Sequence, residues 1–534
     1  MQTTSLPSSD SPVILPSQRC QISKLNFDVL YEIFLTAIFF DEAAVDMPLI
    51  LSQVSPAWRH TVRQNRRLWS RIIVDEEPHA SRKHFLTTIK RVKHFLVRSK
   101  GLPVDVRITF RDFSLHDSGL RRGNRTLQKA AAINQFGQHI QCLSGVLAPH
   151  IWRLQSFKLH AANFETVHDL QLAWPCVALD KLETWEVVLQ DTVPMNSFRF
   201  TGLPIPFRND KDDRAGDFYP RLTTVKLSGS PLAFSRFSPQ HLKSLTLCFL
   251  PEGSLPSLQE LSRILVANAQ TLEHLSLDFA PNSSSHCEVV ALPRLLCLSL
   301  EYRHPSDLLP LVKALRLPSI ISLSITGHEH AQLFPETWIS TSCTFQLLQT
   351  LVNQFPLSQL EKLSLIHFRI LPVWCSDDII NENHIPGASH LSVIPVRFFA
   401  SLSQLTSLTL VYPTSTPLDC ITYLPREANG TSPVHLLPKL QDLALIDFNL
   451  HIVRDFLAAL RLCPLRLPLK RIALRMPDAW SKDPHLRTEG LCENSETDFV
   501  HYDAAEETDE LFRALGVQPH CWSMTPQPRH VWDI

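Results

Sequence analysis

Residues 25–74 read LNFDVLYEIFLTAIFFDEAAVDMPLILSQVSPAWRHTVRQNRRLWSRIIV, and this stretch predicts three short helices. Asn26 can cap a first helix over residues 27–39, where apolar side chains recur at helical spacing. Pro48 opens a second short helix. The pair Ser55-Pro56 predicts the start of a third, because serine caps helices and proline favours the first helical position.

Three helices of this length bury little apolar area on their own. The first helix is expected to present one apolar face, made of Leu30, Ile33, Phe34 and Ala37. Trp58 and Trp69 are interpreted as core anchors, with partner contact by their exposed edges as the functional alternative. Such a marginal core suggests a module that completes its packing on another protein.

The stretch resembles the F-box, in the F-box-like form that is common in fungal proteins. Its opening leucine and first helix match at Leu25, Leu30, Ile33 and Phe34. Its second half matches at Leu51, Val54, Trp58-Arg59, Leu68-Trp69 and Ile72-Ile73. Asn26 stands where the family has proline, Ser55 stands where many members have cysteine, and the loop after the first helix is longer than usual.

This resemblance implies that the module docks onto the Skp-type adaptor of a cullin-based ubiquitin ligase. The residues expected to bind the adaptor are Leu25, Phe27, Leu30, Ile33, Phe34, Pro48, Leu51, Val54, Trp58, Leu68 and Trp69.

A different pattern follows the module. Residues 81–99 predict a basic amphipathic helix, and residues 104–110 alternate as a strand does. The basic side of that helix could meet nucleic acid or anionic lipid, but an ordinary solvated face is the expected reading.

The strongest internal signal is a repeated unit, apolar-x-x-apolar-x-apolar, which occurs eleven times between residues 154 and 474 at offsets of 20 to 45 residues. Each unit predicts a short strand with one buried face, and segments such as 258–269 and 308–315 predict returning helices. The residue between the last two apolar positions is often small or hydroxylic, as at Thr246, Ser276, Ser299, Ser324, Ser364, Thr409 and Ala444. These residues are expected to line the concave side, where they suit either protein contact or close strand stacking.

The unit resembles irregular leucine-rich repeats. The expected fold is therefore α/β, with an N-terminal three-helix F-box-like module followed by a leucine-rich-repeat solenoid of short parallel strands and returning helices. The predicted organisation is a disordered N-terminus (1–22), the module (23–77), the solenoid (78–480) and an acidic C-terminal tail or cap (481–534).

Composition limits the function. The net charge of −1 favours neither nucleic acid nor a membrane as partner, and no apolar run is long enough for a membrane span. Charge is unevenly placed: residues 59–100 are strongly basic, whereas residues 489–510 hold nine acidic residues and no lysine or arginine. The start of the chain shows no secretory signal and the 12 cysteines are scattered, so the expected compartment is the cytoplasm or the nucleus.

No enzyme chemistry is predicted. Phosphate-binding glycine loops and a G-x-S-x-G nucleophile motif are missing from the sequence. His328-Glu329-His330 lacks the spacing of a zinc motif, so no metal and no cofactor are expected.

The favoured hypothesis is a substrate-recognition adaptor of a ubiquitin ligase, in which the solenoid binds an unknown protein substrate. The alternative is a repeat-based interaction scaffold without ligase coupling, which Asn26 and the long first loop favour. An enzyme is a third possibility, for which no motif was found in the sequence.

Overall fold

The computed structural model shows a mixed α/β protein built on one large parallel sheet. It describes residues 25–40, 46–76, 81–110, 125–162, 164–172, 174–175, 177–189, 219–230, 234, 237, 239–251, 254–279, 281, 288–327, 338–368, 393–411, 418, 437–446, 448, 452–453, 455–456, 458, 469–475 and 518–521. The predicted α/β class is confirmed.

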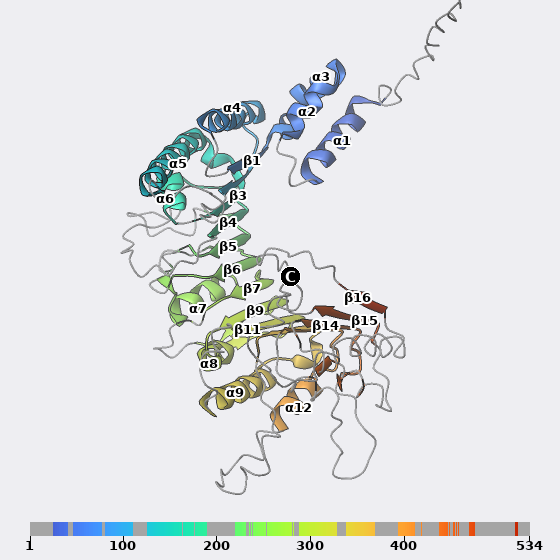
Figure 1. The fold of residues 1–534 in the computed structure, drawn as a ribbon. Coiled ribbons are helices and arrows are strands. Elements are labelled where there is room, and N and C mark those ends of the chain that lie inside the picture. Colours follow the sequence, from blue (N-terminus) through green and yellow to red (C-terminus); the bar gives the residue numbers. More distant parts are fainter. Residues whose placement is uncertain are drawn as a thin grey trace, which may run out of the picture.

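In the described residues, fourteen strands form this sheet, and their spatial order follows the sequence (Figure 1). They are β1 (Arg71–Glu76), β2 (Val104–Phe110), β3 (Leu154–Ala161), β4 (Thr184–Leu189), β5 (Thr224–Ser228), β6 (Ser244–Cys248), β7 (His274–Leu277), β9 (Cys297–Tyr302), β11 (Ser322–Gly327), β12 (Lys362–Ile366), β13 (Ser407–Val411), β14 (Asp442–Ile446), β15 (Arg471–Arg475) and β16 (Gln518–Cys521). Two further short strands, β8 (Val290–Ala291) and β10 (Leu315–Arg316), pair with each other. All eleven strands predicted from the repeated unit are present.

Register is continuous along the sheet from Val106 onward, after one shift between Val104 and Asp105 where β2 pairs with β3. The second apolar position of each unit pairs with the same position in the next, which gives one continuous row: Val106, Phe157, Trp185, Val225, Leu245, Leu275, Leu298, Leu323, Leu363, Leu408, Leu443 and Ile472. Every member of the row is at most 2% exposed. Because side chains alternate along a strand, this row marks the covered face, and the residues between its members face the other way.

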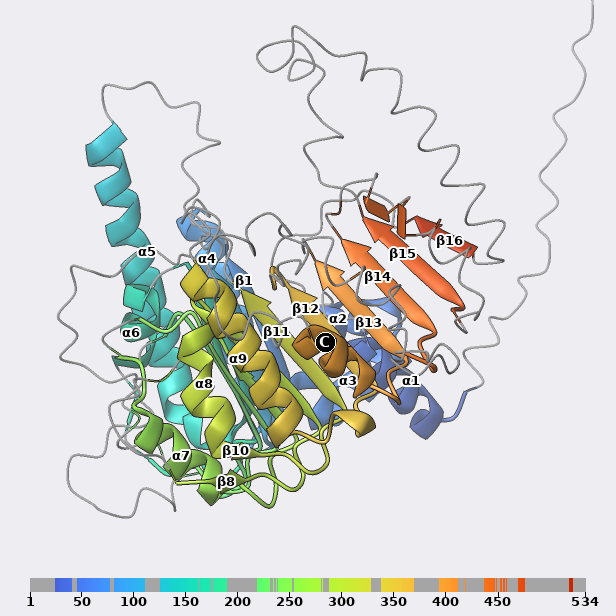
Figure 2. The same cartoon turned by 90° about the horizontal axis from the view of Figure 1, so that it is seen from below.

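Helices return the chain along the covered face, where α7, α8 and α9 lie side by side (Figure 2). The helices beyond the first three are α4 (Arg82–Ser99), α5 (Arg125–Leu147), α6 (Phe164–Leu172), α7 (Leu258–Ala267), α8 (Pro305–Ala314), α9 (Trp338–Gln354) and α12 (Val393–Ala400), with 3-10 turns η3 (Ala148–Arg153) and η7 (Leu357–Gln359). Neighbouring helices pack on each other, as α8 does on α9. Ser257 and Glu260 form a capping box that fixes the start of α7.

The N-terminal stretch forms α1 (Phe27–Phe40), α2 (Met47–Val54), α3 (Pro56–Gln64) and the 3-10 turn η2 (Arg66–Trp69). The predicted caps are present: the side chain of Asn26 accepts a hydrogen bond from the Asp28 N–H (3.3 Å), and that of Ser55 accepts one from the Trp58 N–H (3.2 Å). The three predicted helices are therefore confirmed.

Strand pairing crosses two of the predicted boundaries. The boundary at residues 77/78 lies between β1 and β2, and all of β1 pairs with β2 in the same sheet. The end of the predicted module is thus the first strand of this sheet. At the other end, β16 lies inside the predicted acidic tail or cap and pairs with β15.

Candidate docking surface on the N-terminal helices

The buried stripe of α1 differs from the expected apolar face. Leu30, Phe34 and Ile38 are buried, whereas Ile33 is 44% exposed. The Phe34 ring lies 4.8 Å from that of Trp58, which places α1 against α3. The polar residues Asp28, Glu32 and Thr36 lie on the side opposite this buried stripe and are exposed.

The eleven residues expected to bind an adaptor divide into two sets. Six form the core of the helices: Leu30, Phe34, Pro48, Leu51, Leu68 and Trp69. Three are exposed: Phe27, Ile33 and Val54. The remaining two, Leu25 and Trp58, are half-buried. The structure therefore offers only part of the predicted set for direct contact.

Sequence reasoning missed the other exposed apolar residues of this region. Half of the large apolar side chains exposed in the described part of the chain lie on α1 and α2: Phe27, Val29, Ile33, Phe39, Phe40, Ile50 and Val54. Contiguous apolar surface of this kind is typical of a protein-binding site. The signal was available in the sequence, because Asp28, Glu32 and Thr36 recur every four residues and mark the outward side of residues 27–40, next to which Val29 and Ile33 lie.

An open groove of about 790 Å³ runs along the outer side of α1. Val29, Ile33, Ala37 and Phe40 form its apolar wall, and Met47 of α2 closes one side. Asp28 and Glu32 add an acidic rim. The groove has the dimensions of a site for the side chains of another protein, and we call it the α1 groove.

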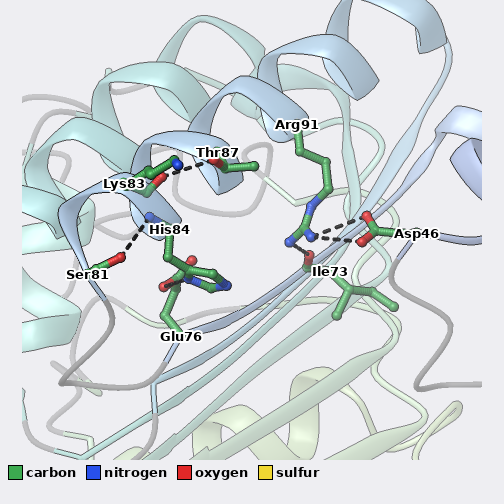
Figure 3. Close-up of polar contacts among 8 residues, drawn as sticks. All are labelled: Asp46, Ile73, Glu76, Ser81, Lys83, His84, Thr87 and Arg91. Atoms are coloured by element: carbon green, nitrogen blue, oxygen red, sulfur yellow. Dashed lines mark hydrogen bonds and ion pairs between the residues drawn. The ribbon is translucent and has the colours of Figure 1, made fainter.

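The groove is held in a fixed position relative to the sheet. Arg91 of α4 donates to the carboxylate of Asp46, at the start of α2, and to the Ile73 carbonyl of β1 (3.3 Å; Figure 3). Arg71 of β1 donates to the Ile38 carbonyl of α1. These contacts join the helices to the sheet as one unit.

The opposite face of the sheet is a second candidate surface, whose small residues are half-buried or, at Ser324 and Ser364, buried. Its central row begins with charged residues on β2–β5, which are Arg107, Lys158, Glu186 and Lys226. From β6 onward the row is small or hydroxylic, as predicted: Thr246, Ser276, Ser299, Ser324, Ser364, Thr409 and Ala444. The predicted row of small residues is confirmed, and its role in binding stays a prediction.

In the charged part of this row, Glu186 lies close to three basic side chains. Its carboxylate lies 3.6 Å from Lys158 Nζ, 3.3 Å from Lys226 Nζ and 3.5 Å from His160 Nε2. Burial opposes its ionisation, but the hydrogen bond from His160 and the two lysine charges outweigh burial and lower the pKa of Glu186 to about 2.

Acid should therefore weaken the fold through this carboxylate. Because the pKa of Glu186 falls from 4.5 to about 2 on folding, its stabilisation is complete above pH 4.5 and is lost as the pH falls toward 2. We expect Glu186→Gln to flatten the pH dependence of the free energy of unfolding in this range, as measured by urea denaturation. Glu165→Gln, at an exposed position on α6, is the matched control and should leave the slope unchanged. Equal slopes for the two variants would contradict the assignment.

In the described residues, no group of three or more His, Cys, Asp or Glu side chains could hold a metal ion. His328-Glu329-His330 lies outside the described residues. Neither the models of known protein families nor the sequences of curated proteins match this chain.

Proposed function

We propose that this protein is a substrate-recognition adaptor of a Skp-cullin-F-box type ubiquitin ligase. Its N-terminal helices would act as an F-box-like module that binds a Skp-type adaptor, and its sheet as an irregular leucine-rich-repeat solenoid that binds a protein substrate. The chain would do no chemistry itself. It would raise the effective concentration of the substrate at the ligase by holding both partners at once.

The observation that carries the proposal is the α1 groove. An apolar groove on a small helical module is the form expected of a surface that another protein covers, because leaving Val29, Ile33 and Phe40 in water is unfavourable. A Skp-type adaptor is proposed as that partner because the sequence of these helices resembles the F-box. The sheet face opposite the helices would supply a separate surface for the substrate.

The test uses an exposed residue of the groove. We expect Ile33→Asp to abolish co-purification of the full-length chain with the Skp-type adaptor, because a carboxylate would be buried without a partner in the complex. Folding should be preserved, since Ile33 is 44% exposed. Aspartate at the buried positions Leu30 or Phe34 would unfold the module and is unsuitable.

Val266→Asp is the matched control. It also replaces a β-branched, exposed residue on a helix, α7, and it lies far along the chain from the groove. Capture should persist in this variant. If Ile33→Asp still captures the adaptor as the unaltered chain does, ligase coupling through this groove is refuted.

The alternative function is a repeat-based scaffold without ligase coupling. It is favoured by Asn26, whose side chain accepts a hydrogen bond at the N-terminus of α1, at the position where the family has proline. Deleting residues 1–77 would not distinguish a ligase adaptor from a scaffold, because the deletion also removes β1 from the sheet. The Ile33→Asp comparison avoids this problem. Substrate capture that persists in a chain which never binds the adaptor would support the scaffold.

A further inference from the structure

Helix α4 presents an outer face of unusual composition. Its core side buries Phe85, Ile89, Val92, Phe95 and Leu96 against the sheet and α5. At about 100° per residue, the exposed residues of α4 cover an arc of about 200°, and six of them lie within about 100° at one side of it. They are Arg82, Lys83, Leu86, Lys90, Lys93 and Val97, all of them exposed, and we call them the α4 outer face.

Two apolar side chains occupy the middle of this face. Leu86 is 47% exposed and Val97 is 70% exposed, and both lie near the centre of the 100° arc. Cations lie on either side of them. The other exposed residues of the helix, His84, Thr87 and His94, are polar, so the exposed large apolar side chains of α4 are confined to its cationic side.

The cations of the face are available to a partner. None of its four cationic side chains forms an ion pair with another described residue. The polar groups of α4 that do have partners point elsewhere: Figure 3 shows Arg91 reaching Asp46 and His84 beside Glu76 (3.4 Å).

The sequence of α4 and the segments near it is poor in acidic residues. Residues 47–74 and 78–104 contain no aspartate or glutamate. The positive surface extends from α4 onto α3, since burial and the nearby charges of Arg98 and Arg63 all lower the pKa of His94. The result is a convex basic surface around an apolar centre.

We propose that the α4 outer face binds the surface of an anionic lipid bilayer. Lysine and arginine side chains can keep their charges among anionic headgroups while their stems lie along the apolar boundary, and Leu86 and Val97 would enter that boundary between them. The contact is peripheral: among the helices that the structure describes, none has the length and apolar character that a bilayer crossing requires.

Nucleic acid fits this face less well. Backbone phosphates would meet the two apolar side chains at its centre, and the face carries no aromatic residue on which bases could stack. The face is also distinct from the α1 groove, so the inference does not depend on the proposed function.

The test is co-sedimentation of the full-length chain with vesicles. We expect binding to vesicles of phosphatidylcholine mixed with phosphatidylserine and none to vesicles of phosphatidylcholine alone, with loss of binding at high salt. Reversing two charges with Lys90→Glu and Lys93→Glu should lower the partition coefficient by more than about tenfold. Leu86→Ser with Val97→Ser should lower it severalfold without any change in charge.

Two controls make the result decisive. Lys243→Glu with Lys313→Glu changes the net charge equally at exposed positions outside the face and should leave binding unchanged. Ile33→Asp should also bind vesicles normally, which separates this surface from the α1 groove. The proposal is overturned if the serine variant binds as the unaltered chain does, if the control lysines matter as much as those of α4, or if the chain binds RNA or DNA oligonucleotides and not the vesicles.

Discussion

Replacing Arg153 with alanine should lower the free energy of unfolding by about 3 kcal/mol or more, because a buried hydrogen-bond cluster would lose its charged donor group. Arg153 is 2% exposed. Its guanidinium donates to the carbonyls of Leu102 (2.9 Å) and Leu96 (3.2 Å) and to the Ser99 hydroxyl (2.6 Å). These groups end α4 and lead into β2, so one side chain satisfies the helix C-terminus and fixes its direction.

Urea denaturation of the full-length chain measures this effect. Arg63→Ala removes the same side chain from an exposed position on α3 and should change stability by no more than about 0.5 kcal/mol. Arg153→Lys keeps the charge but cannot reproduce the fork of donors, so its loss should fall between the two. Equal stability of Arg153→Ala and Arg63→Ala would show that the cluster contributes nothing.

The repeated strands could be predicted because each one is decided locally. The unit around Leu245 carries its own alternation, and the same is true of Leu298 and Leu408, so a short window of sequence identifies the buried side. Register then follows from stacking equivalent positions. β1 was not recognised because Ile72-Ile73-Val74 follows a helical module directly and its partner β2 begins only at Val104.

The candidate site was harder to predict than the fold. In α1, Ile33 and Ile38 are chemically alike, yet one is 44% exposed and the other 2%. The difference arises because Phe34 packs on Trp58, a contact that no local pattern contains. The hydrogen bonds of Arg153 could not be predicted from a local pattern either, since its acceptors lie more than fifty residues away in the sequence. Contacts between distant segments therefore decide which predicted residues are core and which are surface.

Trp69 illustrates these two roles best, because it was interpreted as a core anchor with partner contact as the alternative, and it is 2% exposed. Its indole donates to the Val62 carbonyl of α3 (2.8 Å), and its ring meets Phe95 of α4 edge-on at 5.2 Å. The side chain thus joins the helical module to the first helix of the following part. Trp69→Ala should destabilise the chain by about 3–5 kcal/mol, since it removes a buried aromatic side chain and leaves a cavity between α3 and α4.

Trp152→Ala is the control for this prediction: its side chain is 47% exposed, and the substitution should cost about 1 kcal/mol or less. Thermal or urea unfolding would measure both. If Trp69 acts through the core, then Trp69→Ala should weaken adaptor capture only as far as it unfolds the module, and cooling should restore capture. Ile33→Asp should abolish capture at every temperature at which the chain is folded. Identical behaviour of the two variants would show that Trp69 contacts the partner directly, against its buried position here.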